Sequence, residues 1–212
     1  MDIGCGAGAT SLPLVGRVGG IVGVDEQHDM LEAFQSGAAA AGVHAETVRG
    51  RWPAVAEFVP TAEVVVCGHV LYNEPDAVPF LRAMDAHAVR RVIIELTDSH
   101  PIQWMADLWR RFHGLRWPDG PTAADAQDVI GDMGLPVRHE IHTARGDRGS
   151  GGFERRRDAV ALVRRRLCLA PERDGDVADA LGPMLRERGG LWSAGPPEQT
   201  VVTLWGDVTP DR

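Results

Sequence analysis

Three glycines alternate at the start of the chain, and they constrain the fold more than any other feature of the sequence. An acidic and a branched apolar residue precede Gly4, and apolar residues compatible with a helix follow in the segment 12–15. This is the pattern of a strand that runs through a tight turn into a helix. Gly4 and Gly6 can adopt positive φ without a Cβ penalty and let a ligand approach the backbone closely. Gly8 lets the following helix pack tightly on the sheet.

Two classes of ligand use such a turn. A dinucleotide fold needs G-x-G-x-x-G/A, which Gly4, Gly6 and Ala9 satisfy. The stretch resembles more closely the D-x-G-x-G-x-G turn of the class I S-adenosylmethionine (SAM)-dependent methyltransferases, because Asp2 stands two residues before the first glycine and the glycines alternate strictly. A dinucleotide-binding strand carries an apolar residue at that buried position. The resemblance implies that the turn from Asp2 to Gly8, Cys5 included, contacts the cofactor. A glycine-rich loop without a ligand is the remaining alternative.

Composition excludes several other classes. The length of 212 residues suits one α/β domain, and the net charge of −8 argues against nucleic acid as a partner. All 22 basic residues are arginine, so Schiff-base, pyridoxal phosphate and P-loop lysine chemistry are excluded. Cys5, Cys67 and Cys168 are too widely spaced for a disulfide framework or a zinc site, so we expect no metal. No apolar run reaches the length of a membrane span, which predicts a cytoplasmic protein without a membrane partner.

A second signal lies at the end of the next predicted strand, 21–24, where Asp25 follows 17 residues after Gly8. A carboxylate at this place in nucleoside-binding α/β folds accepts both ribose hydroxyls. We expect Asp25 and the adjacent Glu26 to contact the cofactor. Capping of the helix predicted at 27–41 is a compatible alternative for Asp25. Met30, Leu31 and Phe34 have core spacing in that helix, and the resemblance implies that Met30 lies under the adenine.

The third predicted strand, 43–48, departs from the family pattern. Many relatives continue with Gly-Asp-Ala, whose acid accepts the adenine amino group, whereas this chain continues with Arg49, Gly50, Arg51 and Trp52. Arg51 and Trp52 could flank the adenine by stacking instead. A surface arginine and a half-buried tryptophan are the alternatives.

The fourth predicted strand, 62–69, leads into the segment 70–75, and the resemblance implies that this segment lies beside the reactive methyl group. Gly68 and His69 are therefore expected at the cofactor. His69 is the side chain there that can act as a base near neutral pH, and Tyr72 is a second catalytic candidate. The alternative for His69 is a ring that donates to a backbone carbonyl at the strand end.

A helix from Pro75 to His87 and a fifth strand over 89–96 complete the first half. Ligands of doubly wound sheets bind outside the carboxyl ends of the strands. Asp2, Asp25, Trp52, the segment 67–72 and the segment 95–100 are therefore expected to converge on one rim.

Beyond residue 100 the sequence is less generic. The first predicted element is an aromatic amphipathic helix around residues 100–112 that could cover an acceptor. It is followed by a helix capped by Thr122 and ending at Met133, a sixth strand over 135–141 and a seventh over 200–205. Between the last two strands we expect a flexible loop at 145–152 and helices over 153–169 and 176–189. They would form an α-helical cap or dimer surface. The arginine clusters 155–157 and 164–166 suggest a solvated helix face, with an anionic acceptor or acidic partner as the alternative.

The central strand has only residues 1–3 before the glycine turn, and the helices that usually close the cofactor pocket are absent. Either the natural start lies upstream of Met1, or the fold works with a truncated edge that a second subunit could cover. We expect the chain as given to form a homodimer.

The sequence thus resembles the class I, Rossmann-like methyltransferases. The resemblance implies a doubly wound α/β sheet, mostly parallel with an antiparallel last strand, and a helical insertion between strands six and seven. The single domain 1–212 would consist of a cofactor-binding half (1–99), a lid and insertion that shape the acceptor site (100–199) and the last strand (200–206). The implied reaction is methyl transfer from SAM to a small-molecule acceptor, with S-adenosylhomocysteine (SAH) as product. An NAD-dependent oxidoreductase and a SAM-binding protein without turnover are the alternatives.

Overall fold

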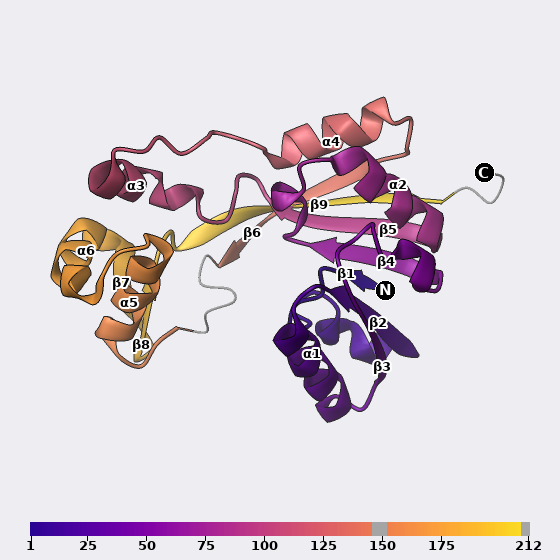
Figure 1. The fold of residues 1–212 in the computed structure, drawn as a ribbon, viewed down its shortest axis with the longest axis horizontal. Coiled ribbons are helices and arrows are strands. Elements are labelled where there is room, and N and C mark those ends of the chain that lie inside the picture. The colour runs from indigo at the N-terminus through magenta and orange to yellow at the C-terminus, as the bar shows by residue number, and fades with distance from the viewer. Residues whose placement is uncertain (146–151, 209–212) are drawn as a thin grey trace. The chain divides into compact units, whose positions relative to one another are not determined.

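The computed structural model describes residues 1–145 and 152–208, so most of the loop expected at 145–152 lies outside the described residues. The chain divides into two compact units (Figure 1). The first, the sheet unit, comprises residues 1–98, 121–141 and 201–212. The second, the helical unit, comprises residues 99–120 and 142–200. The predicted lid and insertion, 100–199 of a single domain, differ from it because residues 121–141 belong to the sheet unit.

Seven strands form the main sheet, in the order β3-β2-β1-β4-β5-β9-β6. They are β1 (Asp2–Ile3), β2 (Gly20–Asp25), β3 (His44–Arg49), β4 (Ala62–Gly68), β5 (Ala88–Thr97), β6 (Arg138–Arg145) and β9 (Glu198–Asp207). β1 is parallel to both β2 and β4, and β9 runs antiparallel to β5. The predicted fold class, a mostly parallel doubly wound sheet with an antiparallel last strand, is confirmed. The strand order reverses between β1 and β4, which is where such sheets bind ligands.

The helices of the sheet unit are α1 (His28–Ala40), α2 (Ala77–His87) and α4 (Ala123–Asp132), with short 3₁₀ helices η1 (Leu12–Arg17), η2 (Ala56–Phe58) and η3 (Leu71–Asn73). α1 packs on β2 and β3, whereas α2 packs on β4, β5 and α4. Because parallel crossovers are right-handed, the reversal of strand order puts α1 and α2 on opposite faces of the sheet. The predicted cap of α4 is confirmed: Thr122 accepts from the Asp125 N–H, and Asp125 accepts from the Thr122 N–H.

The short central strand is buried on both faces. Asp2 and Ile3 are fully inaccessible to solvent. The carbonyl of Met1 accepts from the Val66 N–H at 2.9 Å, and the terminal ammonium of Met1 donates to the Val64 carbonyl at 2.8 Å. These two bonds extend the pairing with β4 by one residue beyond the strand itself.

The helical unit has a core of its own, formed by seven buried residues: Met105, Leu108, Val160, Val163, Leu167, Val177 and Leu181. Its helices are α3 (Ala106–His113), α5 (Arg156–Arg166) and α6 (Asp174–Leu181), with 3₁₀ helices η4 (Gln103–Met105), η5 (Pro171–Arg173) and η6 (Gly182–Met184). The aromatic helix predicted before residue 113 corresponds to η4 and α3. The helix predicted over 153–169 is present but shorter at both ends.

The helix predicted over 176–189 is wrong beyond Leu181, and the insertion is therefore not purely helical. β7 (Leu185–Arg188) and β8 (Leu191–Ala194) form an antiparallel hairpin there. Gly182 adopts φ 47°, and the proline after it cannot continue the helix. Gly189 and Gly190 both have positive φ, as the two central residues of a tight hairpin turn require.

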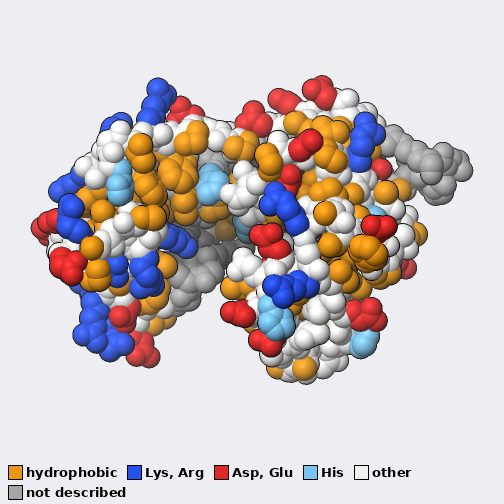
Figure 2. Space-filling view, in the orientation of Figure 1, with side chains coloured by type: hydrophobic (Ala, Val, Ile, Leu, Met, Phe, Trp, Pro, Cys, Tyr) orange, Lys and Arg blue, Asp and Glu red, His pale blue; other side chains and the backbone are white. Residues whose placement is uncertain are grey.

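Charge is distributed unevenly between the units. Fourteen of the 22 arginines belong to the segments 99–120 and 142–200, and Figure 2 shows basic side chains gathered over the unit that carries α3, α5 and α6. The predicted solvated face holds for Arg155, Arg156 and Arg157, which are exposed. Arg164 differs, because its guanidinium donates to Asp174 at 2.7 Å and to the Leu169 carbonyl.

Within the described residues, no helix combines the length and the apolar character needed to cross a bilayer.

Candidate functional site

The glycine turn follows β1 directly and is hydrogen-bonded to the carboxyl end of β2. The Gly4 N–H donates to the Val24 carbonyl at 2.8 Å, and Gly4 adopts φ 67°. A Cβ at Gly4 would collide with a methyl group of Val70, whereas one at Gly6 would meet open space. At Gly8 a Cβ would press on Leu12 and Phe34, which confirms that this glycine permits close helix packing. The three glycines therefore serve three different purposes.

Asp25 closes the same turn from the end of β2. Its Oδ2 accepts from the Gly6 N–H at 2.9 Å, and its Oδ1 accepts from the Gln27 N–H at 2.9 Å. Both carboxylate oxygens are thus oriented by backbone groups, and each retains lone-pair capacity for a ligand hydroxyl. The residue at the N-cap position of α1 is Gln27, so Asp25 supports the helix start from two residues upstream.

A cavity of about 250 Å³ lies at this edge of the sheet unit, over the ends of β1, β2 and β4. Six of the twelve residues predicted to bind the cofactor line it: Gly4, Asp25, Glu26, Arg51, Trp52 and His69. The other six, Asp2, Cys5, Gly6, Gly8, Met30 and Gly68, are not among its lining residues. Met30 is 39% exposed on α1, so the core position expected from its spacing is wrong, while Leu31 and Phe34 are buried as predicted.

Asp2 acts from inside the sheet rather than at the cavity wall. The Ser11 hydroxyl donates to Asp2 Oδ2 at 2.6 Å, and Oδ1 is buried without a hydrogen-bond partner among the described residues. Burial raises the pKa of the Asp2 carboxyl to about 6. Burial likewise raises the pKa of the Cys5 thiol to about 12, so this cysteine is an inert packing residue. The acid that identified the turn in the sequence therefore supports it structurally.

Arg51 and Trp52 both reach the cavity, in different ways. Trp52 is 4% exposed, which makes it more buried than the half-buried alternative, and its indole N–H donates to the Phe80 carbonyl at 3.2 Å. Arg51 pairs with Glu74 at 3.1 Å. Glu74 also lines the cavity and was not predicted from the sequence. The sequence shows Glu74 as an acid in the loop after the fourth strand, but only the fold shows that it lies opposite Arg51.

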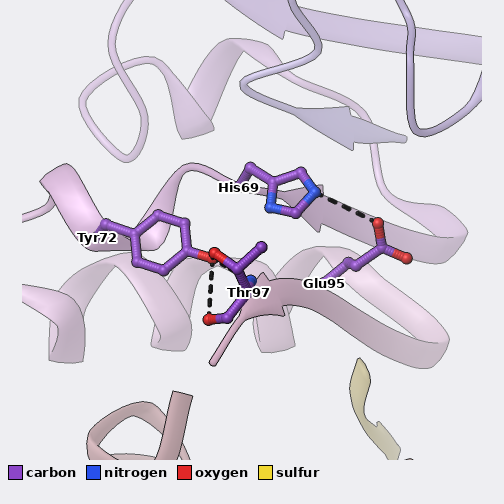
Figure 3. Close-up of polar contacts among 4 residues, drawn as sticks. All are labelled: His69, Tyr72, Glu95 and Thr97. Carbon is purple, nitrogen blue, oxygen red and sulfur yellow. Dashed lines mark hydrogen bonds and ion pairs between the residues drawn. The ribbon is translucent and has the colours of Figure 1, made fainter. Parts of the chain in front are cut away.

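A second group of polar side chains joins the ends of β4 and β5 (Figure 3). His69, in a left-handed conformation with φ 59°, donates its backbone N–H to the Glu95 carbonyl at 2.8 Å. Its Nε2 lies 3.4 Å from Glu95 Oε1, so the ring faces a carboxylate instead of the backbone carbonyl considered from the sequence. The rings of His69 and Tyr72 are nearly parallel, with centroids 6.5 Å apart. The two catalytic candidates are thus neighbours.

Tyr72 is less suited to proton transfer than His69. Its hydroxyl lies 2.7 Å from Thr97 Oγ1, donates to the Thr97 carbonyl and accepts from the Thr97 N–H. Burial raises the pKa of Tyr72 to about 12. Tyr72 does not line the 250 Å³ cavity, whereas His69 does. The geometry therefore gives Tyr72 a supporting place behind His69.

Comparison with known proteins agrees with this arrangement. Residues 1–89 match the family model described as methyltransferase domain. No curated protein matches the sequence. Among solved structures, the YcgJ protein of Bacillus subtilis is similar over 97% of this chain and 89% of its own, with 16% identity and a TM-score of 0.58. A putative methyltransferase of Bacillus halodurans C-125 is similar over 97% and 90%, with 13% identity and a TM-score of 0.57.

A third similar structure is the magnesium protoporphyrin IX methyltransferase ChlM of Synechocystis PCC 6803, solved with bound SAH. It is similar over 96% of this chain and 71% of its own, with 15% identity and a TM-score of 0.53. These likenesses establish the fold, and the match to the family model covers residues 1–89. Together with the glycine turn and Asp25, they show that the chain has the Rossmann-like fold of class I methyltransferases and that its first 89 residues match a methyltransferase domain.

Proposed function

We propose that the chain methylates a small-molecule acceptor, with SAM held in the 250 Å³ cavity and SAH left as product. The observation that carries this proposal is the position of Asp25. Its carboxylate is oriented by the Gly6 and Gln27 N–H groups and lies at the wall of a cavity that Gly4, the first glycine of the turn, also lines. That is the arrangement a ribose with two adjacent hydroxyls needs.

The charge of the cavity favours SAM over a dinucleotide. Asp25, Glu26 and Glu74 line it, and the lining guanidinium of Arg51 is already paired with Glu74. A negative wall attracts a sulfonium cation and repels the pyrophosphate of NAD. This supports the methyltransferase function against the oxidoreductase considered from the sequence.

The cofactor supplies an electrophilic methyl group on a positively charged sulfur, so the chain has to orient the acceptor and remove its proton. Catalysis of this kind depends mainly on proximity and alignment. His69 lines the cavity, and its side chain is 41% exposed, so an acceptor can reach it. We infer that His69 takes the proton of an acceptor hydroxyl or amine.

A smaller, mainly apolar pocket of about 90 Å³ is evidence in favour of a small acceptor. Leu71, Tyr72, Leu96 and Val129 contribute to its wall, and Glu74 lines both this pocket and the larger cavity. An apolar group of the acceptor would fit there, beside η3, which follows His69 closely in the chain. The cytoplasmic location and the homodimer expected from the sequence stay predictions.

Isothermal calorimetry with SAM, SAH and NADH tests the cofactor directly. We expect SAM and SAH to bind and NADH not to bind. Micromolar binding of NADH without binding of SAM or SAH would overturn the proposal. Turnover tests the catalytic part: His69→Ala should lower kcat by about 10²-fold and leave SAH affinity nearly unchanged. Full turnover of this variant on any identified acceptor would remove His69 from the mechanism.

A further inference from the structure

We propose that Glu95 is the positioning residue of the site and fixes His69 in the tautomer that carries its proton on Nε2, so that Nδ1 is the nitrogen that accepts the acceptor's proton. This inference rests on the proposed function, because it assigns the atom through which His69 acts. It also makes a statement about the imidazole that can be measured without turnover.

The first support is the geometry between β4 and β5. Gly68 is paired with Glu95 in the parallel register of the two strands, and the His69 N–H donates to the Glu95 carbonyl. The backbone therefore fixes the two side chains next to each other, and Figure 3 shows the imidazole directed at the carboxylate. The separation of 3.4 Å between Nε2 and Oε1 is an ion-pair distance, and such contacts in ligand-free sites often shorten when the ligand binds.

The second support is the chemistry of the two groups. A neutral imidazole has one N–H donor and one lone-pair acceptor, whereas an ionised carboxylate can only accept. The nitrogen that faces Glu95 is therefore the one that carries hydrogen, which leaves the lone pair of His69 on Nδ1. If Nδ1 faced the carboxylate instead, the assignment would reverse.

The third support is the restraint on the ring. A left-handed backbone conformation is unfavourable at a residue with a Cβ, and such strain is concentrated at functional sites. His69 is in this conformation. On one side its ring is nearly parallel to that of Tyr72, whose hydroxyl is fixed by Thr97. Orientation of the imidazole is thus set by the backbone, by an aromatic neighbour and by Glu95.

The proton balance of the step is simple. The acceptor's oxygen or nitrogen forms a bond to the methyl carbon, and the electron pair of the broken carbon–sulfur bond stays on sulfur. The acceptor's proton moves to His69 Nδ1. Glu95 takes up no proton; its negative charge faces the imidazolium that results, as a carboxylate does behind the histidine of a hydrolytic triad.

We expect the Glu95 side chain to contribute little to the stability of the fold. The side chains of His69 and Glu95 are 41% and 32% exposed, and ion pairs of such exposure contribute little to stability. Glu95→Gln should therefore fold normally. Its neutral amide can donate or accept, so it no longer selects one tautomer.

The test is nitrogen NMR of the imidazoles in ¹⁵N-labelled full-length protein, at alkaline pH where histidine is neutral, with and without SAH. The chain has 8 histidines, so a His69→Gln sample assigns the signals of His69. We expect the Nε2–H tautomer in the wild type and a mixture in Glu95→Gln. Glu63→Gln, an exposed carboxylate change on β4, is the matched control and should leave the tautomer unchanged.

An Nδ1–H tautomer in the wild type, or the same mixture in the wild type and Glu95→Gln, would overturn the proposal. With an identified acceptor, Glu95→Gln should also lower kcat about ten-fold or more while SAH affinity stays the same. The proposed function and the role of Glu95 are tested separately. If the wild type does not bind SAH, the proposed function is contradicted, whereas the tautomer measurement addresses Glu95 alone.

Discussion

Asp2 provides a quantitative test of how the centre of the sheet is built, because it lies on β1, the strand between β2 and β4. The side chain is fully buried, and it has one hydrogen bond from Ser11 and one oxygen without a partner among the described residues. Burial raises its pKa from 3.8 to about 6, against the smaller, opposite effect of the Ser11 hydrogen bond. At neutral pH the folded protein therefore contains a buried carboxylate at the start of the turn.

The sign of the effect on stability follows from proton binding. Between the unfolded-state and folded-state pKa values, the folded chain binds more protons than the unfolded chain, so unfolding free energy falls as pH rises. The stabilisation from the bound proton is complete below about pH 4 and is lost as the pH passes through 6. A difference of about two pKa units corresponds to about 3 kcal/mol.

The assay compares the wild type with Asp2→Asn by urea unfolding at a series of pH values. Asparagine does not titrate, and its side-chain oxygen can still accept from Ser11. The wild type should lose about 3 kcal/mol relative to the variant between about pH 4 and 8. Asp29→Asn, an exposed change on α1, controls for the removal of one charge. Hydrogen exchange of the Val66 amide, which donates to Met1, reports on the same strands.

A difference between wild type and Asp2→Asn that stays constant across this pH range would refute the reasoning. It would mean that the carboxylate is hydrated or paired in the folded protein, so that its ionisation costs nothing. A difference that grows in favour of the wild type would show that the carboxylate form is the stabilised one, as it is for an acid held by several donors.

Three further predictions follow from the site and its supports. Asp25→Ala should weaken SAH binding about 30- to 150-fold, since two hydrogen bonds to a charged group contribute roughly 2–3 kcal/mol. If calorimetry gives an unchanged dissociation constant for SAH, Asp25 has a structural role only. Gly4→Ala should destabilise the fold more than Gly6→Ala, because only the first places a Cβ against Val70. Adding Val70→Ala to Gly4→Ala should partly restore the melting temperature. Equal melting temperatures of the two glycine variants would contradict the predicted clash. Thr122→Ala should cost about 1 kcal/mol in thermal unfolding through loss of the α4 cap, and no loss would mean that water replaces the threonine oxygen.

The sequence alone was sufficient for features whose cause is local. The glycine turn, the strand that ends in Asp25 and the helix that begins after Thr122 each depend on backbone chemistry within a few residues, and the structure has all three. Apolar runs and turn residues likewise predicted the seven strands of the sheet, most with small shifts of their ends. The sixth differs most: it was predicted over 135–141, but it begins at Arg138 and ends at Arg145. The hairpin at 185–194 was missed although Gly182-Pro183 and Gly189-Gly190 signalled it locally.

Contacts between distant segments had to come from the tertiary structure. Whether an acid next to a glycine turn faces a ligand or the interior depends on which strands flank it, and Asp2 faces the interior because β1 lies between β2 and β4. Glu74 reaches Arg51, and Glu95 reaches His69, only because parallel strands end at one edge of the sheet. Local pattern determines what each strand and turn can be, whereas the order of the strands decides which side chains meet at their ends. The resemblance to the methyltransferases could therefore be recognised from nine residues of the sequence, but the partner of the candidate base His69 could not.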